Sequence, residues 1–206
     1  MELISALLGQ VIGVGVLALI IVFQQEVRRF LLVLGTNNIL TKNTFTKQIL
    51  PWNWQFKKNP PLDISAIVKA CRQMSKDRTG AIIVLAQSSQ LKYFANTGDT
   101  MDAEISQRLI ESIFFKNSPM HDGAIIIVNN KIKAARCVLP VTENIELPAH
   151  LGMRHRAAIG ITEQSDALAI VVSEETGEIS LSSEGQIRVN ITVEELEKSL
   201  REEFEQ

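Results

Sequence analysis

The N-terminal part of the sequence contains an apolar run that only a membrane or a fully buried helix accommodates. Residues Leu3 to Phe23 include no charged side chain, and 16 of these 21 residues are aliphatic or aromatic. Three others are glycine, and the last two are Ser5 and Gln10. As an α-helix this run is about 32 Å long, close to the thickness of the hydrocarbon core of a bilayer. We therefore predict one transmembrane helix over residues 3–23.

Two alternatives fit the run less well. A secretory signal peptide has basic residues before a shorter apolar core and ends at a small-residue cleavage site. Here Glu2 precedes the run, and Gln24, Gln25 and Glu26 follow it. A helix buried in a soluble domain rarely stays uncharged for 21 positions, since such helices normally keep a polar face.

The charges that follow the run predict its orientation. Between residues 24 and 58 a single acidic residue, Glu26, accompanies six basic ones: Arg28, Arg29, Lys42, Lys47, Lys57 and Lys58. The positive-inside rule places such a flank in the cytoplasm. We therefore expect a single-pass protein of the cell membrane, in contact with the lipid bilayer, with its C-terminal domain in the cytoplasm.

The remaining composition narrows what that domain can be. The formal net charge is −2, so a basic surplus does not support binding to nucleic acid, and we expect no such partner. The two cysteines, Cys71 and Cys137, are too few and too far apart for a disulfide framework or a cysteine-based zinc site. Residues 24–61 predict a juxtamembrane helix and a polar linker, which leaves residues 62–206 for one domain.

The hydrophobic pattern of residues 62–206 alternates between helices and strands. Spacings of three and four residues predict helices over 63–76, 102–115, 148–159 and 192–204. Apolar runs predict strands at 80–86, 123–128 and 167–173, and further strands are predicted at 91–95, 131–139, 178–183 and 186–190, with Asn129-Asn130 as a tight turn. The fold class that follows is α/β, a mixed β-sheet surrounded by helices.

Three polar clusters adjoin these apolar segments, at residues 118–124, 152–158 and 173–177. In the first cluster His121 and Asp122 precede a predicted buried strand, beside a glycine at which a ligand can approach the backbone. This arrangement suits a metal or phosphate site. In the second cluster two arginines flank a histidine in an otherwise apolar helix, where cations are costly to bury without anions.

Each cluster also has a purely structural interpretation. Asp122-Gly123 is an ordinary turn dipeptide, Arg154 and Arg156 can pair with surface acids, and Glu174-Glu175 can belong to a solvated hairpin turn. The sequence has no Walker A loop, no G-x-S-x-G and no H-E-x-x-H motif. The presence of all these polar residues at the ends of predicted core elements favours a functional site.

The first two clusters resemble the motifs of a known family. His121-Asp122-Gly123-Ala124 and Arg154-His155-Arg156 are similar to the DGA and RHR motifs of the diadenylate cyclase (DAC) domain. The segments 79–84 and 173–177 fit the same family, and residues 22–29 resemble the junction after the last span of its membrane-bound members. The likeness runs from about residue 10 to the C-terminus. Two features depart from it: such members usually have three spans, and Met153 stands where they often have Thr.

The resemblance implies the condensation of two ATP molecules into cyclic di-AMP, with release of two pyrophosphates. It implies that Asp122, with His121 and Glu175, holds a divalent cation, Mg²⁺ or Mn²⁺. It further implies that Gly123 and Ala124 line the ribose. The other implied nucleotide contacts are Leu139 at the adenine, Ser173 and Met153 near the phosphates, and Arg154, His155 and Arg156 positioning phosphate or pocket.

The symmetric product implies a face-to-face homodimer, because each ATP attacks the other. A catalytically silent sensor that binds an adenine nucleotide at the membrane is the alternative function. Such a sensor could dispense with the metal ligand, so the presence of Asp122, both arginines and Glu175 favours the enzyme. A metal-dependent phosphohydrolase fits less well, since the sequence shows no second His/Asp cluster for a two-metal site.

Overall fold

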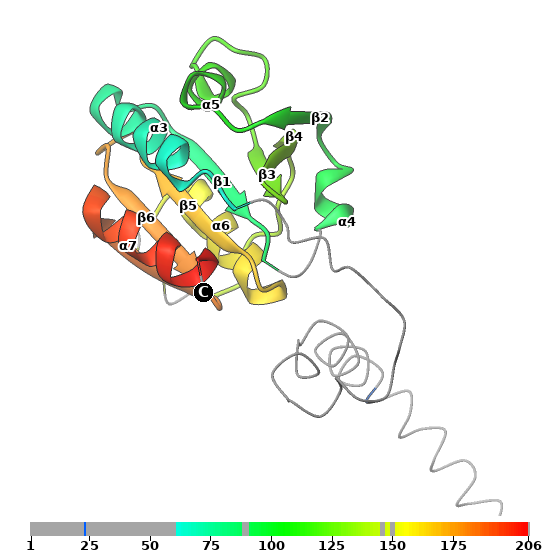
Figure 1. The fold of residues 1–206 in the computed structure, drawn as a ribbon. Coiled ribbons are helices and arrows are strands. Elements are labelled where there is room, and N and C mark those ends of the chain that lie inside the picture. The colour runs from blue at the N-terminus through cyan, green and yellow to red at the C-terminus, as the bar shows by residue number, and fades with distance from the viewer. Residues whose placement is uncertain (1–22, 24–60, 88–90, 145–146, 149–150, 206) are drawn as a thin grey trace, which may run out of the picture. The chain divides into compact units, whose positions relative to one another are not determined.

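The computed structural model describes residues 23, 61–87, 91–144, 147–148 and 151–205. Seven strands form one sheet in the order β2-β4-β3-β1-β5-β6-β7, with helices on both faces (Figure 1). The strands are β1 (Ala81–Leu85), β2 (Asp99–Glu104), β3 (Ala124–Val128), β4 (Lys131–Cys137), β5 (Leu168–Val172), β6 (Ile179–Ser183) and β7 (Gln186–Ile191). The helices are α3 (Ile64–Asp77), α4 (Lys92–Ala95), α5 (Gln107–Phe114), α6 (Met153–Gln164) and α7 (Val193–Phe204).

The centre of the sheet consists of three fully buried strands. β1 pairs in parallel with β3 and antiparallel with β5, so that Ile83 lies between Ile125 and Ile170. Every residue of these three strands is buried. Continuous apolar sequences suit this position, because a central strand is covered on both faces. The predicted fold class, a mixed sheet surrounded by helices, is confirmed.

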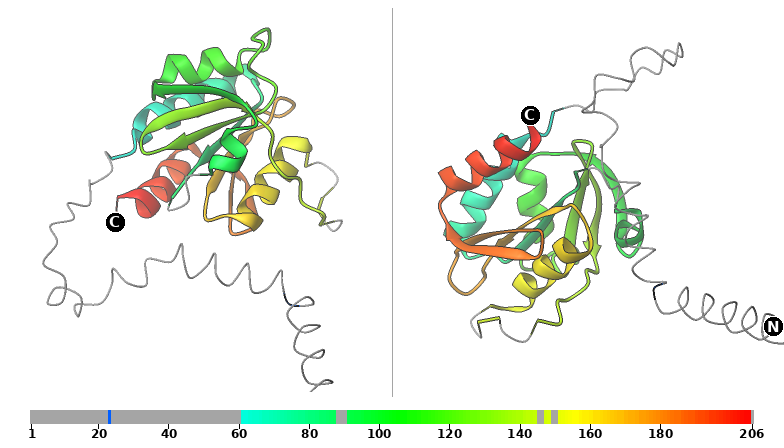
Figure 2. Two further views of the ribbon diagram at one scale, coloured as in Figure 1. Left: turned by 90° about the vertical axis from the view of Figure 1, so that its right-hand side faces the viewer. Right: turned by 90° about the horizontal axis from the view of Figure 1, so that it is seen from below.

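The two faces of the sheet carry separate apolar layers. Ile83 and Ile125 pack in the layer that includes α3, α5 and α7, whereas Ile82 and Ile126 pack in the layer that includes α6. The alternation follows from the two-residue period of side chains along a strand. Figure 2 shows α3 and α7 on one side of the sheet and α6 on the other.

Local capping and turn signals agree with the sequence analysis. The Asp63 carboxylate accepts a hydrogen bond from the Ala66 N–H at the start of α3. Thr192 and Glu195 form a reciprocal capping box at the start of α7. Asn129 and Asn130 both have positive φ, at 51° and 59°, as a two-residue hairpin turn between β3 and β4 requires. The predicted ends of these elements are correct to within about two residues.

The predicted strand over residues 91–95 is wrong, because this segment contains the short helix α4. Leu91 has φ 46° in the left-handed region, where a strand cannot start. The Thr97 hydroxyl donates to the Phe94 carbonyl and closes the helical turn. A five-residue segment with four apolar residues fits a helical turn as well as a strand, so periodicity alone could not separate them.

Two predicted helices have different limits in the structure. Residues 102–104 belong to the polar edge strand β2, and α5 starts only after Ser106, whose hydroxyl accepts from the Leu109 N–H. The helix predicted over 148–159 is shifted: α6 begins at Met153, after Gly152, and continues to Gln164. Met101 and Ala103 alternate with Asp102 and Glu104, which is the two-residue period of a strand, but this short signal also lies within the helical spacing assigned to residues 102–115.

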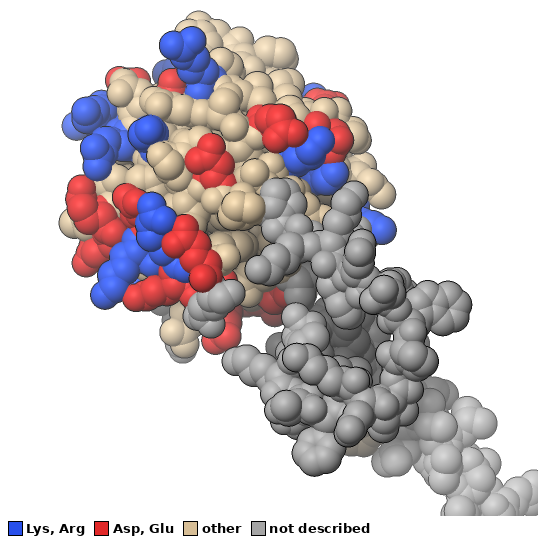
Figure 3. All heavy atoms as spheres, in the orientation of Figure 1, with Lys and Arg blue, Asp and Glu red and all other residues tan. Residues whose placement is uncertain are grey.

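The surface formed by α7 carries both signs of charge. Arg201 pairs with Glu197 and Glu205 at 2.7 Å each, and Arg72 of α3 contacts Glu194 at 3.3 Å. Figure 3 shows acidic and basic side chains interspersed there. This face therefore lacks, among its described residues, the basic stripe typical of nucleic-acid binding.

The predicted transmembrane helix, juxtamembrane helix and linker, residues 3–61, lie outside the described residues apart from Phe23 and Pro61. Within the described part of the chain, no helix has both the length and the apolar character needed to cross a membrane. Residues from 61 onward belong to one compact unit, Gln55–Gln206.

Candidate active site

A cavity of about 750 Å³ lies at the end of the sheet where β3 begins and β5 finishes. These two strand ends lie at the same end of the sheet, on either side of β1, because β5 runs antiparallel to β1 and β3 runs parallel to it. The cavity therefore collects three segments that are far apart in the sequence. Ten of the predicted site residues line it: His121, Asp122, Gly123, Ala124, Leu139, Met153, Arg154, His155, Ser173 and Glu175.

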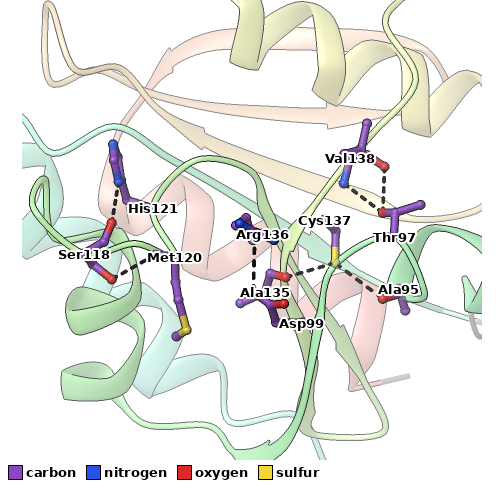
Figure 4. A network of polar contacts seen from close by, with 10 residues as sticks. All are labelled: Ala95, Thr97, Asp99, Ser118, Met120, His121, Ala135, Arg136, Cys137 and Val138. Carbon is purple, nitrogen blue, oxygen red and sulfur yellow. Dashed lines mark hydrogen bonds and ion pairs between the residues drawn. The ribbon is translucent and has the colours of Figure 1, made fainter.

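The first segment orients a histidine beside an exposed carboxylate. His121 Nδ1 lies 2.6 Å from the Ser118 carbonyl oxygen, and the Ser118 hydroxyl accepts from the Met120 N–H at 3.2 Å (Figure 4). Because a carbonyl can only accept, Nδ1 is the donor, and the neutral ring has its lone pair on Nε2. Asp122 is exposed at the mouth of the cavity, one residue further on.

Gly123 is required by the backbone at this point. Its φ is +139°, a region that residues with a side chain rarely adopt. A Cβ there would lie 2.7 Å from the carbonyl carbon of Arg136 in β4. The neighbour that excludes a side chain is therefore the adjacent strand, whereas the sequence analysis invoked an approaching ligand.

The second segment is the N-terminal end of α6, which faces the cavity. The first backbone N–H groups of a helix have no intrahelical partner, and Gly152 provides no side-chain cap. Arg154 Nη1 donates to Glu174 Oε2 at 2.8 Å, and the two side chains are 25% and 62% exposed. His155 is buried at the cavity wall.

Arg156 is the predicted site residue that does not line the cavity. Positions two apart on a helix are about 200° apart around its axis, so Arg154 and Arg156 point in different directions. Arg156 is half-buried, and its carbonyl accepts from the Thr142 N–H at 3.2 Å. The role of Arg156 in positioning phosphate or the pocket therefore stays a prediction.

The third segment is the turn after β5. The Ser173 hydroxyl accepts from the backbone N–H groups of Glu175 and Thr176, at 3.3 and 3.2 Å. The Gly177 N–H closes the turn by donating to the Ser173 carbonyl at 3.0 Å. This compact turn brings both acidic residues, Glu174 and Glu175, to the cavity.

An apolar wall completes the cavity, and the sequence analysis identified only part of it. Val138 and Val141 line the cavity beside Leu139, and like Met153 they are exposed. A Cβ on Gly160 of α6 would overlap the Pro140 carbonyl oxygen, so this segment lies directly against the helix. The sequence analysis did not predict Val138 and Val141. Their closeness to Leu139 in the sequence is the feature that could have indicated them.

Among the described residues, no group of three His, Cys, Asp or Glu side chains is placed to hold a metal ion. The predicted three-residue metal site therefore stays a prediction. Cys137 lines the cavity, but burial and then the nearby Asp99 raise the pKa of its thiol to about 11. The Cys137 thiol is thus protonated at neutral pH. A sulfur that binds a metal or acts as a nucleophile has to be a thiolate instead.

Comparisons with known proteins agree with this geometry. The family model described as DAC, DisA bacterial checkpoint controller nucleotide-binding, matches residues 68–187. The cyclic di-AMP synthase CdaA of Bacillus subtilis is 40% identical over 198 residues, which are 96% of this chain and 69% of that protein. A diadenylate cyclase of Listeria monocytogenes is 38% identical over 204 residues, which are 99% of this chain and 71% of that protein.

Two solved structures are also similar to this chain. A double mutant of DacA from Staphylococcus aureus has a TM-score of 0.67 and 44% identity, covering 68% of this chain and 93% of that one. A hypothetical membrane spanning protein from Bacillus cereus has a TM-score of 0.62 and 40% identity, covering 66% of this chain and 67% of that one. The chain belongs to the DAC family of nucleotide-binding proteins.

Proposed function

We propose that this chain is a diadenylate cyclase, a nucleotidyltransferase that converts two ATP molecules into cyclic di-AMP and two pyrophosphates. The cyclic di-AMP synthase and the diadenylate cyclase named above align with nearly the whole chain. The observation that carries the proposal is that the DGA motif, the start of the RHR motif and the Ser173 turn line one cavity. Its volume of about 750 Å³ lies in the usual range for a small-molecule site.

The reaction consists of two nucleotidyl transfers, each at an α-phosphate. The 3′-hydroxyl oxygen of each ATP bonds to the α-phosphorus of the other, the bond from that phosphorus to pyrophosphate breaks, and the hydroxyl proton is lost. Such transfers depend on alignment and on neutralisation of charge more than on covalent chemistry by the protein. The relevant question is therefore which side chains hold the phosphates and the ribose.

The donor atoms at one side of the cavity fit a divalent cation, Mg²⁺ or Mn²⁺. Asp122 offers an exposed carboxylate, and the hydrogen bond from His121 Nδ1 to Ser118 leaves Nε2 as an acceptor. Mg²⁺ is commonly held by one or two carboxylates together with substrate phosphates. We assign Asp122 and His121 to this cation and Glu175 as a further ligand, which would have to move closer when the cation binds, since the described residues hold no preformed group of three. When bound, the cation would neutralise phosphate charge and polarise the α-phosphate.

The phosphates are assigned to the N-terminal end of α6 and the adjoining turn. Unpaired N–H groups and the positive end of the helix favour an anion there. The Arg154 guanidinium adds a full charge, and the Ser173 hydroxyl lies at the cavity wall. Met153 supplies only its backbone N–H, since its thioether is a weak acceptor and not a donor.

The nucleoside is assigned to the apolar wall. Leu139, with its neighbour Val138, offers aliphatic surface to the adenine ring. Gly123 and Ala124 line the same cavity at the start of β3, where the absence of large side chains leaves room for a ribose. His155, buried at the cavity wall, is assigned to shaping the pocket.

Membrane attachment is part of the same proposal. The uncharged run over 3–23 is long enough to span a bilayer, and the basic flank supports a catalytic domain on the cytoplasmic side. We expect the full chain to sediment with membranes, and a fragment that begins at Pro60 to be soluble, folded and able to bind ATP. Ultracentrifugation measures the sedimentation of the full chain and the solubility of the fragment, and circular dichroism measures whether the fragment is folded. A fragment that is insoluble or unfolded would contradict the domain boundary.

The decisive experiment incubates the full chain with ATP and Mg²⁺ or Mn²⁺ and identifies the products by chromatography and mass spectrometry. The proposal requires cyclic di-AMP and two pyrophosphates for each product molecule. ATP binding without turnover would instead indicate the sensor function. Release of inorganic phosphate or ADP would indicate a phosphohydrolase.

A further inference from the structure

The guanidinium of Arg154 lies over a backbone position that has no side chain. That position is Gly80, the buried residue directly before β1. A Cβ on Gly80 would lie 2.7 Å from Arg154 Nη1 and 2.9 Å from Glu174 Oε2. These are the two atoms that form the 2.8 Å ion pair. Three segments, before β1, in α6 and after β5, therefore meet at one guanidinium.

This arrangement orients Arg154 without using all of its donors. A guanidinium has five N–H donors, and Glu174 is the only described side chain that pairs with Arg154. The remaining donors have no side-chain partner among the described residues, which leaves them open to phosphate oxygens. An exposed ion pair contributes little to the stability of a fold, and Glu174 is 62% exposed. The main effect of the pair is therefore to restrict the rotamers of Arg154 before the ligand binds. Phosphate binding then loses less side-chain entropy.

We infer that Gly80 and Glu174 are positioning residues, which hold the Arg154 guanidinium ready for the triphosphate of the bound nucleotide. The inference rests on the proposed function, since it takes ATP as the ligand. Neither residue touches the reacting atoms in this scheme. Gly80 provides the space that the guanidinium occupies, and Glu174 provides the charge that keeps it there.

Gly80→Ala tests the space without changing any charge. The atom that an added methyl meets is the far end of a flexible side chain, so the arginine moves and the fold is kept. A displacement of about 1 Å at a positioning group costs on the order of a hundredfold in rate. We expect kcat/KM for ATP to fall to about this extent, with a higher KM and an unchanged melting temperature.

Glu174→Gln tests the charge without changing the shape. The amide oxygen still accepts a hydrogen bond but no longer forms an ion pair, so we expect KM for ATP to rise about tenfold. Glu178→Gln is the matched control, because Glu178 is an exposed acid in the same turn that lies outside the cavity lining. We expect the control to behave like the wild type.

The Arg154→Ala background separates positioning from a structural role. Binding of 3′-deoxy-ATP, which lacks the attacking hydroxyl, is measured in the full chain by calorimetry. If both residues act through Arg154, Gly80→Ala and Glu174→Gln weaken binding in the wild type and have no further effect in Arg154→Ala. Equal losses in both backgrounds would overturn the inference.

The outcomes also separate this inference from the proposed function. A wild-type chain that makes no cyclic di-AMP refutes the proposed function. An active wild type with unchanged KM and 3′-deoxy-ATP affinity in both variants refutes only the positioning role. If Gly80→Ala lowers the melting temperature, Glu174→Gln with its control decides the question alone.

Discussion

Replacement of Asp122 by Asn is expected to lower cyclic di-AMP formation by about a thousandfold or more. The amide keeps the size of the side chain but removes the anionic oxygen that we assign to the divalent cation. Loss of such a ligand removes several kcal/mol of charge stabilisation in the transition state, and each factor of ten in rate corresponds to about 1.4 kcal/mol. Asp122 is exposed, so the substitution should leave the fold intact.

The measurement combines turnover with binding of the metal. Initial rates of product formation are compared at saturating Mn²⁺, and Mn²⁺ binding in the presence of 3′-deoxy-ATP is followed by electron paramagnetic resonance. Asp77→Asn, at an exposed acid at the end of α3, controls for the loss of one charge. Turnover of the Asp122 variant within tenfold of the wild type would remove this residue from the mechanism.

The elements that sequence reasoning identified correctly are those determined by a single strong local signal. The runs Ala81–Leu85, Ala124–Val128 and Leu168–Val172 are continuous apolar sequences, and such sequences need cover on both faces. The helix α7 begins with a capping box that fixes its first turn. In these segments the local preference and the tertiary environment favour the same structure.

The errors occur where tertiary contacts decide between local alternatives. The residues of β2 are mostly polar, and they form a strand because they pair with β4, where Lys131 and Lys133 contact Asp102. The start of α6 at Met153 depends on Gly152 and on the packing of Gly160 against Pro140. β4 and Pro140 are distant in the sequence from the elements that they contact, so local patterns alone did not decide these boundaries.

The candidate site shows the same division. Its polar clusters were visible because they interrupt apolar segments, and sheet topology then brought them together at one cavity. Glu174 was noted only as part of a turn, and Gly80 received no role. Their significance depends on a three-way contact with Arg154 that exists only in the folded chain. Helix geometry likewise separates Arg156 from Arg154, although the RHR motif groups them.

The symmetry of the product determines how many chains one reaction needs. Each ATP supplies one attacking hydroxyl and one α-phosphate, so two equivalent nucleotides must face each other. The sequence contains no internal repeat that could provide a second equivalent site. We therefore propose that two protomers meet in an isologous arrangement, each contributing one nucleotide and one Asp122. A membrane span would assist by confining the domains to a plane and raising their effective concentration.

The soluble fragment that begins at Pro60 should accordingly lose specific activity on dilution. Below the dissociation constant of the dimer, mass action lowers the dimer fraction in proportion to concentration, so a hundredfold dilution should reduce specific activity by about a hundredfold. Excess Asp122→Asn protein should also reduce the activity per wild-type chain, because mixed pairs have one damaged half-site. Analytical ultracentrifugation gives the dimer fraction at each concentration. Constant specific activity across that dilution in a fragment that sediments as a monomer would exclude a two-chain site.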